Sequence, residues 1–350
     1  MSSGAPSGPE AGAEPRLMRK RIPTLEMVAS RAGVSRATVS RVVNGVSTVA
    51  PEAVERIQQA IEELNYVPNR AARSLASNRT GAVALVVPET TVKVFSDPFF
   101  GSVVQGIAMA LAETDYTLNM IIESESNAGK TRRYLMGGNV DGALIVSHHT
   151  GDRSYSELLE ALPMVFAGQP MEDTTGATAI DVDNVDSARA AVDYLIAHGR
   201  RRIATITGPT DMRPGIDRAE GWRQALEAAG LEPGPRFAGD FTLDGGARAA
   251  RELIDSGEPF DAIFAANDLM AMGAYPVLRE AGLTIPDDVA VIGFDDSPAS
   301  QTADPPLTTM RQPMIELGAQ MARQLLRMMD GETPPQLTVL RAHLIERASV

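Results

Sequence analysis

The chain has 350 residues, 44% of them hydrophobic, and a formal net charge of −13. This length favours a small domain joined to a larger two-lobed one over a single domain. The sequence contains no cysteine, which excludes structural disulfides and thiolate metal sites, and no apolar run is long enough for a membrane span. We therefore expect a cytoplasmic protein with no membrane partner.

The charge is spread unevenly along the chain. Residues 1–22 begin with MSSGAPSGPEAGAEP, which is typical of a disordered tail and not of a signal peptide. Between Arg16 and Arg79 there are 11 Lys and Arg against 5 Asp and Glu, whereas the remainder has 21 against 40. A basic module on an acidic body indicates nucleic-acid binding by the basic part, although an incidental arginine cluster would give the same balance.

Residues 23–68 predict three short helices around one apolar centre. Thr24 suits the N-cap of the first helix, Gly33 permits a tight turn, and Ser35 can cap a second helix over 35–43. Asn44 and Gly45 form a turn signal, and Pro51 suits the start of the third helix. The apolar positions at helical spacing are Leu25, Val28, Ala29, Val39, Val42 or Val43, Val54, Ile57, Ile61 and Leu64.

The second helix has a polar outer face that solubility alone does not require. With the valines inward, the outward side chains are Ser35, Arg36, Thr38, Ser40 and Arg41. The major groove of DNA accepts one α-helix, and Arg, Ser and Thr are side chains that read base edges. We interpret this helix as a recognition helix, the alternative being an ordinary solvated helix.

The segments TLEMVASRAGVSRATVSRVVNG (24–45) and VERIQQAIEELNYVPNRAARSLAS (54–77) resemble the lactose-repressor (LacI/GalR) family of bacterial transcription regulators. The resemblance runs from residue 24 to about residue 347 and implies binding to double-stranded operator DNA. In that family the two residues after the capping serine read the operator, which implies this role for Arg36 and Ala37 and a half-site containing G·C. The matching positions also add Thr24, Arg41, Asn44, Tyr66 and Asn69 to the DNA-contacting set.

Residues 69–79 match the hinge helix of the family. The resemblance implies that NRAARSL (69–75) folds on DNA and pairs with the second subunit, and that Leu75 wedges into a minor-groove step while Ala72 allows close approach. A segment rich in Arg and Ala without Gly is consistent with a conditional helix, although a plain interdomain linker is the alternative.

Residues 80–350 alternate short apolar runs with amphipathic stretches. The runs are AVALVV, LNMII, GALIV, MVFA, IATIT, DAIFA and VAVIG, and helical patterns such as VDSARAAVDYLIAHG lie between most of them. Repeated strand–helix units build parallel sheets with helices on both faces, and this number of units favours two sheets with a cleft between them. The expected class is α/β, and the resemblance implies a two-lobed core like that of periplasmic binding proteins.

Polar and aromatic residues follow the predicted strands, where ligands of such folds collect. Planar hydrogen-bonding groups and aromatic rings together suit a sugar. The resemblance implies effector contacts by Arg218, Asn267 and Asp295, with Phe241 where some members place a tryptophan, and it adds Ser147, Phe99 and Phe100. Asp295 as a loop cap and Arg218 as an interlobe ion pair remain alternatives, and Trp222 is expected in the core.

No catalytic motif or metal cluster is recognisable, so we expect neither an enzyme nor a cofactor. His148 and His149 are adjacent, and neighbouring side chains diverge, which argues against a metal site. Two recognition helices must face two half-sites, which predicts a homodimer; a tetramer of the family would need a further C-terminal heptad helix.

The segments PTLEMVA, SRATVSRV, YVPNRAARSL, VALVV and DPPLTTMRQP resemble cellulose-utilisation repressors of actinobacteria. The resemblance implies a repressor that a sugar, cellobiose or a related cello-oligosaccharide, releases from a palindromic operator. The alternatives are a regulator that needs a purine or another metabolite as co-repressor, a solute-binding protein, and a sugar-acting enzyme.

Overall fold

The computed structural model describes residues 23–43, 48–67, 79–123, 128–150, 154–171 and 176–350. Its contacts divide the chain between Arg79 and Thr80 into a small N-terminal unit and a larger unit. None of the helices in these residues is long and apolar enough to cross a membrane.

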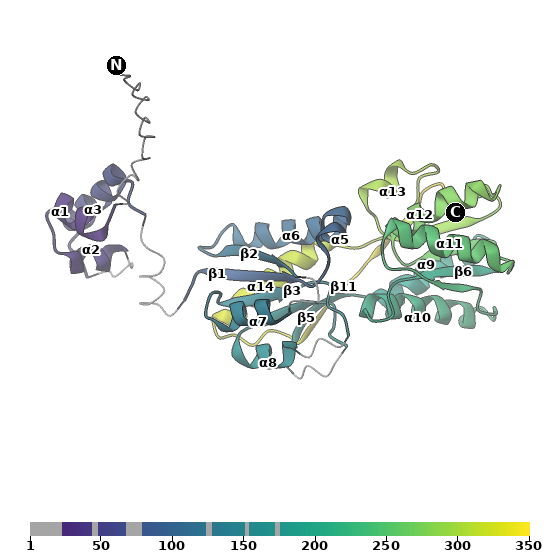
Figure 1. The fold of residues 1–350 in the computed structure, drawn as a ribbon, viewed down its shortest axis with the longest axis horizontal. Coiled ribbons are helices and arrows are strands. Elements are labelled where there is room, and N and C mark those ends of the chain that lie inside the picture. The colour runs from purple at the N-terminus through teal and green to yellow at the C-terminus, as the bar shows by residue number, and fades with distance from the viewer. Residues whose placement is uncertain (1–22, 44–47, 68–78, 124–127, 151–153, 172–175) are drawn as a thin grey trace, which may run out of the picture. The chain divides into compact units, whose positions relative to one another are not determined.

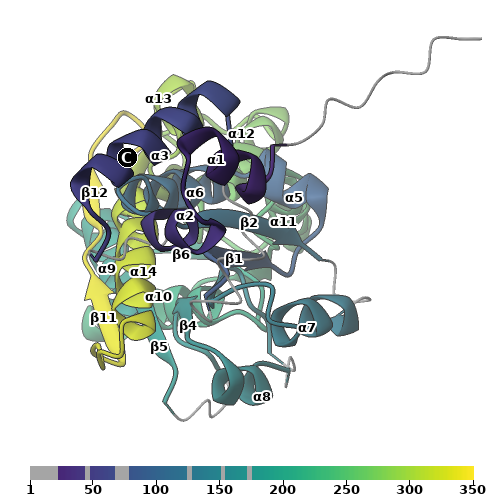
Figure 2. The ribbon, with the colours of Figure 1, turned by 90° about the vertical axis from the view of Figure 1, so that its left-hand side faces the viewer.

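The N-terminal unit is a bundle of three helices, α1 (Leu25–Ala32), α2 (Arg36–Val43) and α3 (Pro51–Leu64). Thr24 caps α1, and Gly33 ends it in the left-handed conformation at φ 66°. The helices enclose one small core whose buried members are Val28, Ala29, Ala32, Val39, Ile57, Ala60 and Tyr66. Figure 2 shows the three helices packed around this centre, as the apolar spacing predicts.

The larger unit contains two six-stranded sheets, which form the two lobes in Figure 1. The first lobe has the strand order β11-β5-β4-β3-β1-β2, and all its strand pairs are parallel. Its strands are β1 (Ala82–Val87), β2 (Thr117–Ile122), β3 (Gly142–Ile145), β4 (Met164–Ala167), β5 (Thr178–Val182) and β11 (Leu337–Leu340).

The second lobe has the strand order β12-β10-β9-β8-β6-β7, and only the pair of β10 and β12 is antiparallel among its described strands. Its strands are β6 (Ile203–Thr207), β7 (Arg236–Ala238), β8 (Ala262–Ala265), β9 (Ala290–Asp295), β10 (Thr308–Arg311) and β12 (His343–Ile345).

Helices cover both faces of each sheet, because the strands are apolar on both sides. In β1, Val83 and Leu85 pack toward the helices α6 and α14, whereas Ala84 and Val86 belong to the core on the side of α7 and α8. The helices of the first lobe are α5 (Thr91–Ser96), α6 (Pro98–Leu111), α7 (Ala128–Met136), α8 (Ser154–Ala161) and α14 (Met314–Met329).

The second lobe is layered in the same way. Trp222 lies in the core between the sheet and the helices α9 and α10, 4% exposed, and its indole nitrogen donates to the carbonyl of Ile203. This confirms the expectation that Trp222 is a core residue. The helices of this lobe are α9 (Asn184–Ala197), α10 (Arg213–Ala228), α11 (Leu243–Ser256), α12 (Asp268–Glu280) and α13 (Pro298–Thr302).

The chain passes between the lobes after β5, after β10 and after β11. Asp183 ties two of these passages together, because its amide donates to the carbonyl of Leu340 and its carboxylate accepts from the amide of Ala342 at 2.9 Å. The two lobes are thus joined by neighbouring extended segments, which can bend without unfolding either sheet.

Candidate functional site

The outer face of α2 carries the predicted base-reading residues. Ser35 caps the helix, since its hydroxyl oxygen accepts from the amide of Thr38 at 3.1 Å. Arg36, Ala37 and Arg41 are exposed, and Ser40 is half-buried. The Nε of Arg36 lies 3.2 Å from a carboxylate oxygen of Glu26 in α1. The local sequence thus places short polar side chains and two arginines on one accessible helix face.

Two other predicted DNA contacts differ in accessibility. Tyr66 is only 7% exposed and lies in the hydrophobic core of the bundle, and its contact with DNA stays a prediction. It follows the end of α3, where Asn65 takes a left-handed conformation at φ 48° and turns the chain back onto the core. Thr24 is exposed and already serves as the cap of α1. Asn44, Asn69, Ala72 and Leu75 lie outside the described residues.

A pocket opens between the two lobes of the larger unit. All seven predicted effector-contacting residues line it, together with seven that the prediction omitted. The full lining is Lys93, Asp97, Phe99, Phe100, Ser147, His148, Ala167, Met212, Pro214, Arg218, Phe241, Asn267, Asp295 and Gln312.

Arg218 is fixed at the floor of the pocket. Its Nε donates to the side chain of Asn184 at 2.9 Å and its Nη1 to the carbonyl of Ala266 at 2.6 Å. The guanidinium carbon lies 3.8 Å from the centroid of the Phe294 ring. Burial lowers the pKa of Arg218, and Asp295 is the first of the carboxylates that oppose this shift. The result is a cationic donor whose position is fixed by contacts within the protein.

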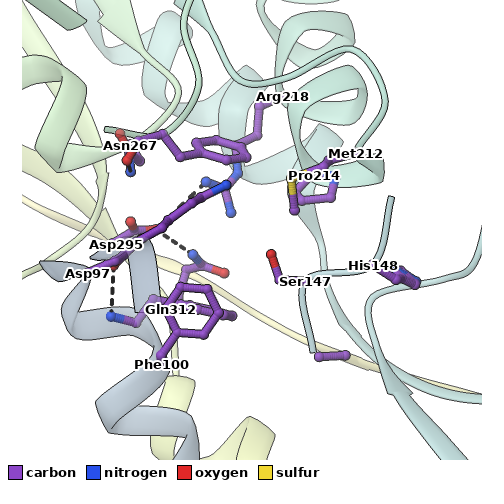
Figure 3. A pocket seen from close by; sticks show the side chains of 14 residues that line it. Asp97, Phe100, Ser147, His148, Met212, Pro214, Arg218, Asn267, Asp295 and Gln312 are labelled. Carbon is purple, nitrogen blue, oxygen red and sulfur yellow. Dashed lines mark hydrogen bonds and ion pairs between the residues drawn. The ribbon is translucent and has the colours of Figure 1, made fainter. Parts of the chain in front are cut away.

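Asp295 lies beside Arg218, with one carboxylate oxygen 3.7 Å from Nη1. The same oxygen accepts a hydrogen bond of 2.5 Å from the side-chain nitrogen Nε2 of Gln312. Burial raises the pKa of Asp295 well above its ordinary value, while Arg218 and Gln312 favour the ionised form. Figure 3 shows Arg218, Asp295, Asp97 and Gln312 gathered on one side of the pocket. These planar polar groups can receive and donate hydrogen bonds to adjacent hydroxyls.

Asn267 has a structural task at the edge of the pocket. Its side-chain oxygen accepts from the amide of Met270 at 2.9 Å and caps α12, while its nitrogen donates to the carbonyl of Phe241 at 3.0 Å. The residue therefore holds the Phe241 loop in place.

Phe241 supplies an aromatic wall of the pocket and depends on a glycine. A Cβ on Gly208 would lie 2.2 Å from the Phe241 ring, so only glycine leaves room for this ring position. The guanidinium carbon of Arg218 lies 5.8 Å from the centroid of the same ring. An apolar ring beside fixed polar groups is the combination that a sugar ring requires.

Three residues that line the pocket have positive φ angles. Ser147, Phe241 and Asp295 have φ values of 66°, 66° and 119°. Such values are uncommon outside glycine and tend to occur at functional sites. Ser147 follows β3, Phe241 follows β7, and Asp295 ends β9. The local strain redirects each side chain from the sheet into the pocket.

The prediction omitted Lys93, Asp97 and Gln312 from the site. Asp97 caps α6 through the amide of Phe99 at 2.9 Å, and burial raises its pKa. Asp97 lies two residues before the predicted Phe99, in the stretch DPFF (97–100), so the same stretch of sequence could have found it. Lys93 lies on the short helix α5 and follows no strand directly, and Gln312 follows β10, a strand that the apolar runs did not predict.

Within the described residues, no group of three His, Asp or Glu side chains is arranged to hold a metal ion. His148 stacks near Phe166 with ring centroids 5.6 Å apart, and Figure 3 shows it apart from the Arg218 cluster. His149 instead contacts Glu89 and Asp211.

Known proteins match both units of the chain. A model for "Bacterial regulatory proteins, lacI family" matches residues 24–69, and a periplasmic binding protein-like domain matches residues 192–350. The HTH-type transcriptional regulator CelR of Thermobifida fusca is 46% identical over 341 residues, which cover 95% of this chain and 99% of CelR. The chain belongs to the lacI family of bacterial regulatory proteins.

Two solved structures of lacI-family regulators are similar over nearly the whole chain. A transcriptional regulator CelR–cellobiose complex is 43% identical with a TM-score of 0.75, and the match covers 94% of this chain and 100% of that one. A lac repressor dimer bound to operator and the anti-inducer ONPF is 29% identical with a TM-score of 0.83, covering 94% and 99%. As a lacI-family member, the protein is a DNA-binding transcriptional regulator with the helix-turn-helix unit and the two-lobed α/β core that the sequence predicts.

Proposed function

We propose that this regulator is a homodimeric repressor that cellobiose, or a related cello-oligosaccharide, releases from a palindromic operator. The observation that carries the proposal is the pocket, in which Arg218, Asp295 and Gln312 lie beside the ring of Phe241. Polar groups fixed next to an aromatic face suit a sugar. The 46% identity to CelR and the likeness to a CelR–cellobiose complex support cellobiose as the first sugar to test.

The pocket is suited to coupling sugar binding to the arrangement of the lobes. Lys93, Asp97 and Ser147 come from the first lobe, whereas Arg218, Phe241 and Asp295 come from the second. A ligand that touches both sets stabilises one separation of the lobes over others. The first lobe begins directly after residues 69–79, so its position relative to the partner subunit's first lobe decides whether two hinge segments can pair on DNA.

Binding of sugar and of operator must then oppose each other. If sugar lowers operator affinity by some factor, operator lowers sugar affinity by the same factor. Arg36, with Ala37, Thr38, Ser40 and Arg41 beside it, is proposed to read the half-site, and Leu75 to wedge into the minor groove at the centre of the operator.

The test is operator retention against a panel of sugars. A palindromic fragment selected from random DNA is bound to the protein and challenged with glucose, cellobiose, cellotriose, maltose, lactose and adenine. Release by cellobiose or cellotriose is expected. Release by a different sugar would contradict the cello-oligosaccharide assignment, and tighter binding in the presence of a purine would replace induction by co-repression.

A further inference from the structure

The two lobes touch directly at His149, beside the mouth of the pocket. His149 follows β3 in the first lobe, and Asp211 lies in the loop after β6 in the second. The Nδ1 of His149 is 2.9 Å from a carboxylate oxygen of Asp211. The amide of Thr150 donates to the carbonyl of Asp211 at 2.8 Å. Both contacts cross from the first lobe to the second.

The other ring nitrogen of His149 reaches back into the first lobe. Its Nε2 lies 3.2 Å from one oxygen of Glu89, and this oxygen also accepts from Lys93 Nζ and Ser147 Oγ, each at 2.7 Å. Lys93 and Ser147 line the effector pocket. A single carboxylate oxygen thus links the interlobe contact to two pocket side chains.

The two contacts together require a proton on each ring nitrogen of His149, and neutral histidine carries a proton on only one of them. A neutral imidazole donates from one nitrogen only, whereas a carboxylate accepts, so donation to Glu89 and Asp211 together needs the imidazolium. The hydrogen bond to Glu89 raises the pKa of His149 to about 8; burial opposes this shift and Asp211 adds to it. Burial raises the pKa of Glu89, but hydrogen bonds from His149, Lys93 and Ser147 more than offset this and keep that pKa below its ordinary value.

We propose that His149 is a positioning residue of the effector pocket, which ties Asp211 of the second lobe to Glu89 of the first and so couples the separation of the lobes to the placement of Lys93 and Ser147. The part that concerns the effector rests on the proposed function. In the lobe arrangement of this structure the bridge is made, and a wider separation of the lobes would break the contacts of Asp211 with His149 and Thr150.

The direction of the pH effect follows from the charges that face the ring. These are Glu89 after β1 and Asp211 after β6, with Lys93 of α5 donating to the same Glu89 oxygen. Bridging raises the pKa of the imidazolium above its ordinary value of 6.5 to about 8. The stabilisation is therefore complete below pH 6.5 and is lost as the pH rises through 8.

The first experiment tests the bridge without any sugar. The ring protons of the full-length protein are titrated by NMR, with His149→Gln identifying the signal. We expect a pKa of about 8 for His149 in the wild type and a lower pKa in Asp211→Asn. An ordinary pKa in the wild type, or a pKa that Asp211→Asn leaves unchanged, would overturn the proposal.

The second experiment measures the coupling. The dissociation constant for cellobiose is measured at pH 6.5 and pH 9 for the wild type, His149→Gln, Asp211→Asn and the control His198→Gln, which replaces an exposed histidine at the end of α9. We expect His149→Gln to weaken binding about threefold to tenfold at pH 6.5 and to match the wild type at pH 9. His198→Gln is expected to behave as the wild type at both values.

The outcomes separate the two proposals. Equal affinities of the wild type and His149→Gln at pH 6.5 would overturn the coupling even if the NMR titration gives a raised pKa. No cellobiose binding by any protein at either pH would contradict the proposed function, and the sugar-free NMR titration would then still decide whether His149 bridges the lobes.

Discussion

Arg36, the first residue of α2, lies with its Nε 3.2 Å from a carboxylate oxygen of Glu26, the second residue of α1. Both side chains are well exposed, so the ion pair adds little to stability. The ion pair does set the position from which the Arg36 side chain, the proposed reader of a base, must move to reach DNA. Arg36 must leave Glu26 before it can form two hydrogen bonds with a guanine.

Removal of the Glu26 charge should therefore strengthen DNA binding. We expect Glu26→Gln to raise operator affinity by up to about 1 kcal/mol, since the guanidinium is released and a negative charge near phosphate is lost.

Arg36→Ala should cost about 1–3 kcal/mol at the operator and relax its specificity. Fluorescence anisotropy with operator and random DNA measures both, with Glu55→Gln on α3 as the control for charge alone. An equal loss on all sequences in Arg36→Ala would identify a phosphate contact instead.

Asp295→Asn should separate sugar binding from DNA binding. The amide keeps the shape of the carboxylate, but it removes the charge beside Arg218 and one strong acceptor for hydroxyls. We expect cellobiose affinity to fall by roughly ten- to a hundredfold, as hydrogen bonds to charged groups are worth about 1.5–3 kcal/mol. Operator affinity without sugar should stay unchanged. The matched control is Asp304→Asn, an exposed carboxylate outside the pocket; a similar loss there would remove the special role of Asp295.

Gly208→Ala should disturb the pocket without adding a group that meets the sugar directly. The new methyl would lie 2.2 Å from the Phe241 ring, which must move. We expect the variant to lose sugar affinity by about 1–2 kcal/mol, comparable to Phe241→Ala, because aromatic contacts contribute about that much. Calorimetric titration measures the effect. Gly101→Ala on α6, where a Cβ meets no atom within 4 Å, is the control. Unchanged affinity in Gly208→Ala would show that the ring position is not needed.

Asp268 should make the stability of the larger unit depend on pH in a defined sense. It is fully buried, it accepts from Thr309 Oγ1 at 2.6 Å and the amide of Ser297 at 2.7 Å, and burial raises its pKa to about 6. The folded state holds this proton more tightly than the unfolded state, so the contribution of Asp268 to stability falls as the pH rises from 4 to 6. The free energy of unfolding of Asp268→Asn, relative to the wild type, should therefore increase across that interval in urea titrations. A constant difference between the two proteins would contradict the raised pKa.

Local sequence signals determined the parts of this protein whose structure depends on neighbours in the chain. Thr24 and Ser35 cap helices as predicted, Val39 and Ile57 pack inward, and the apolar runs such as AVALVV become buried parallel strands. Within each lobe, parallel strands bring their carboxyl ends to the same edge, whatever their separation in sequence, and predicted effector residues from both lobes line one pocket.

The tertiary structure decided what depends on the packing of distant segments. Tyr66 turned inward because the left-handed turn after α3 returned it to the core. Gln312 reached Asp295 because β10 pairs with β9 in a register that places Arg311 opposite Asp295. His149 meets Asp211, 62 residues away, only because the two lobes face each other at this point. Capping and periodicity act over a few residues and are written in the sequence, whereas contacts across a gap exist only once both lobes have folded and come together.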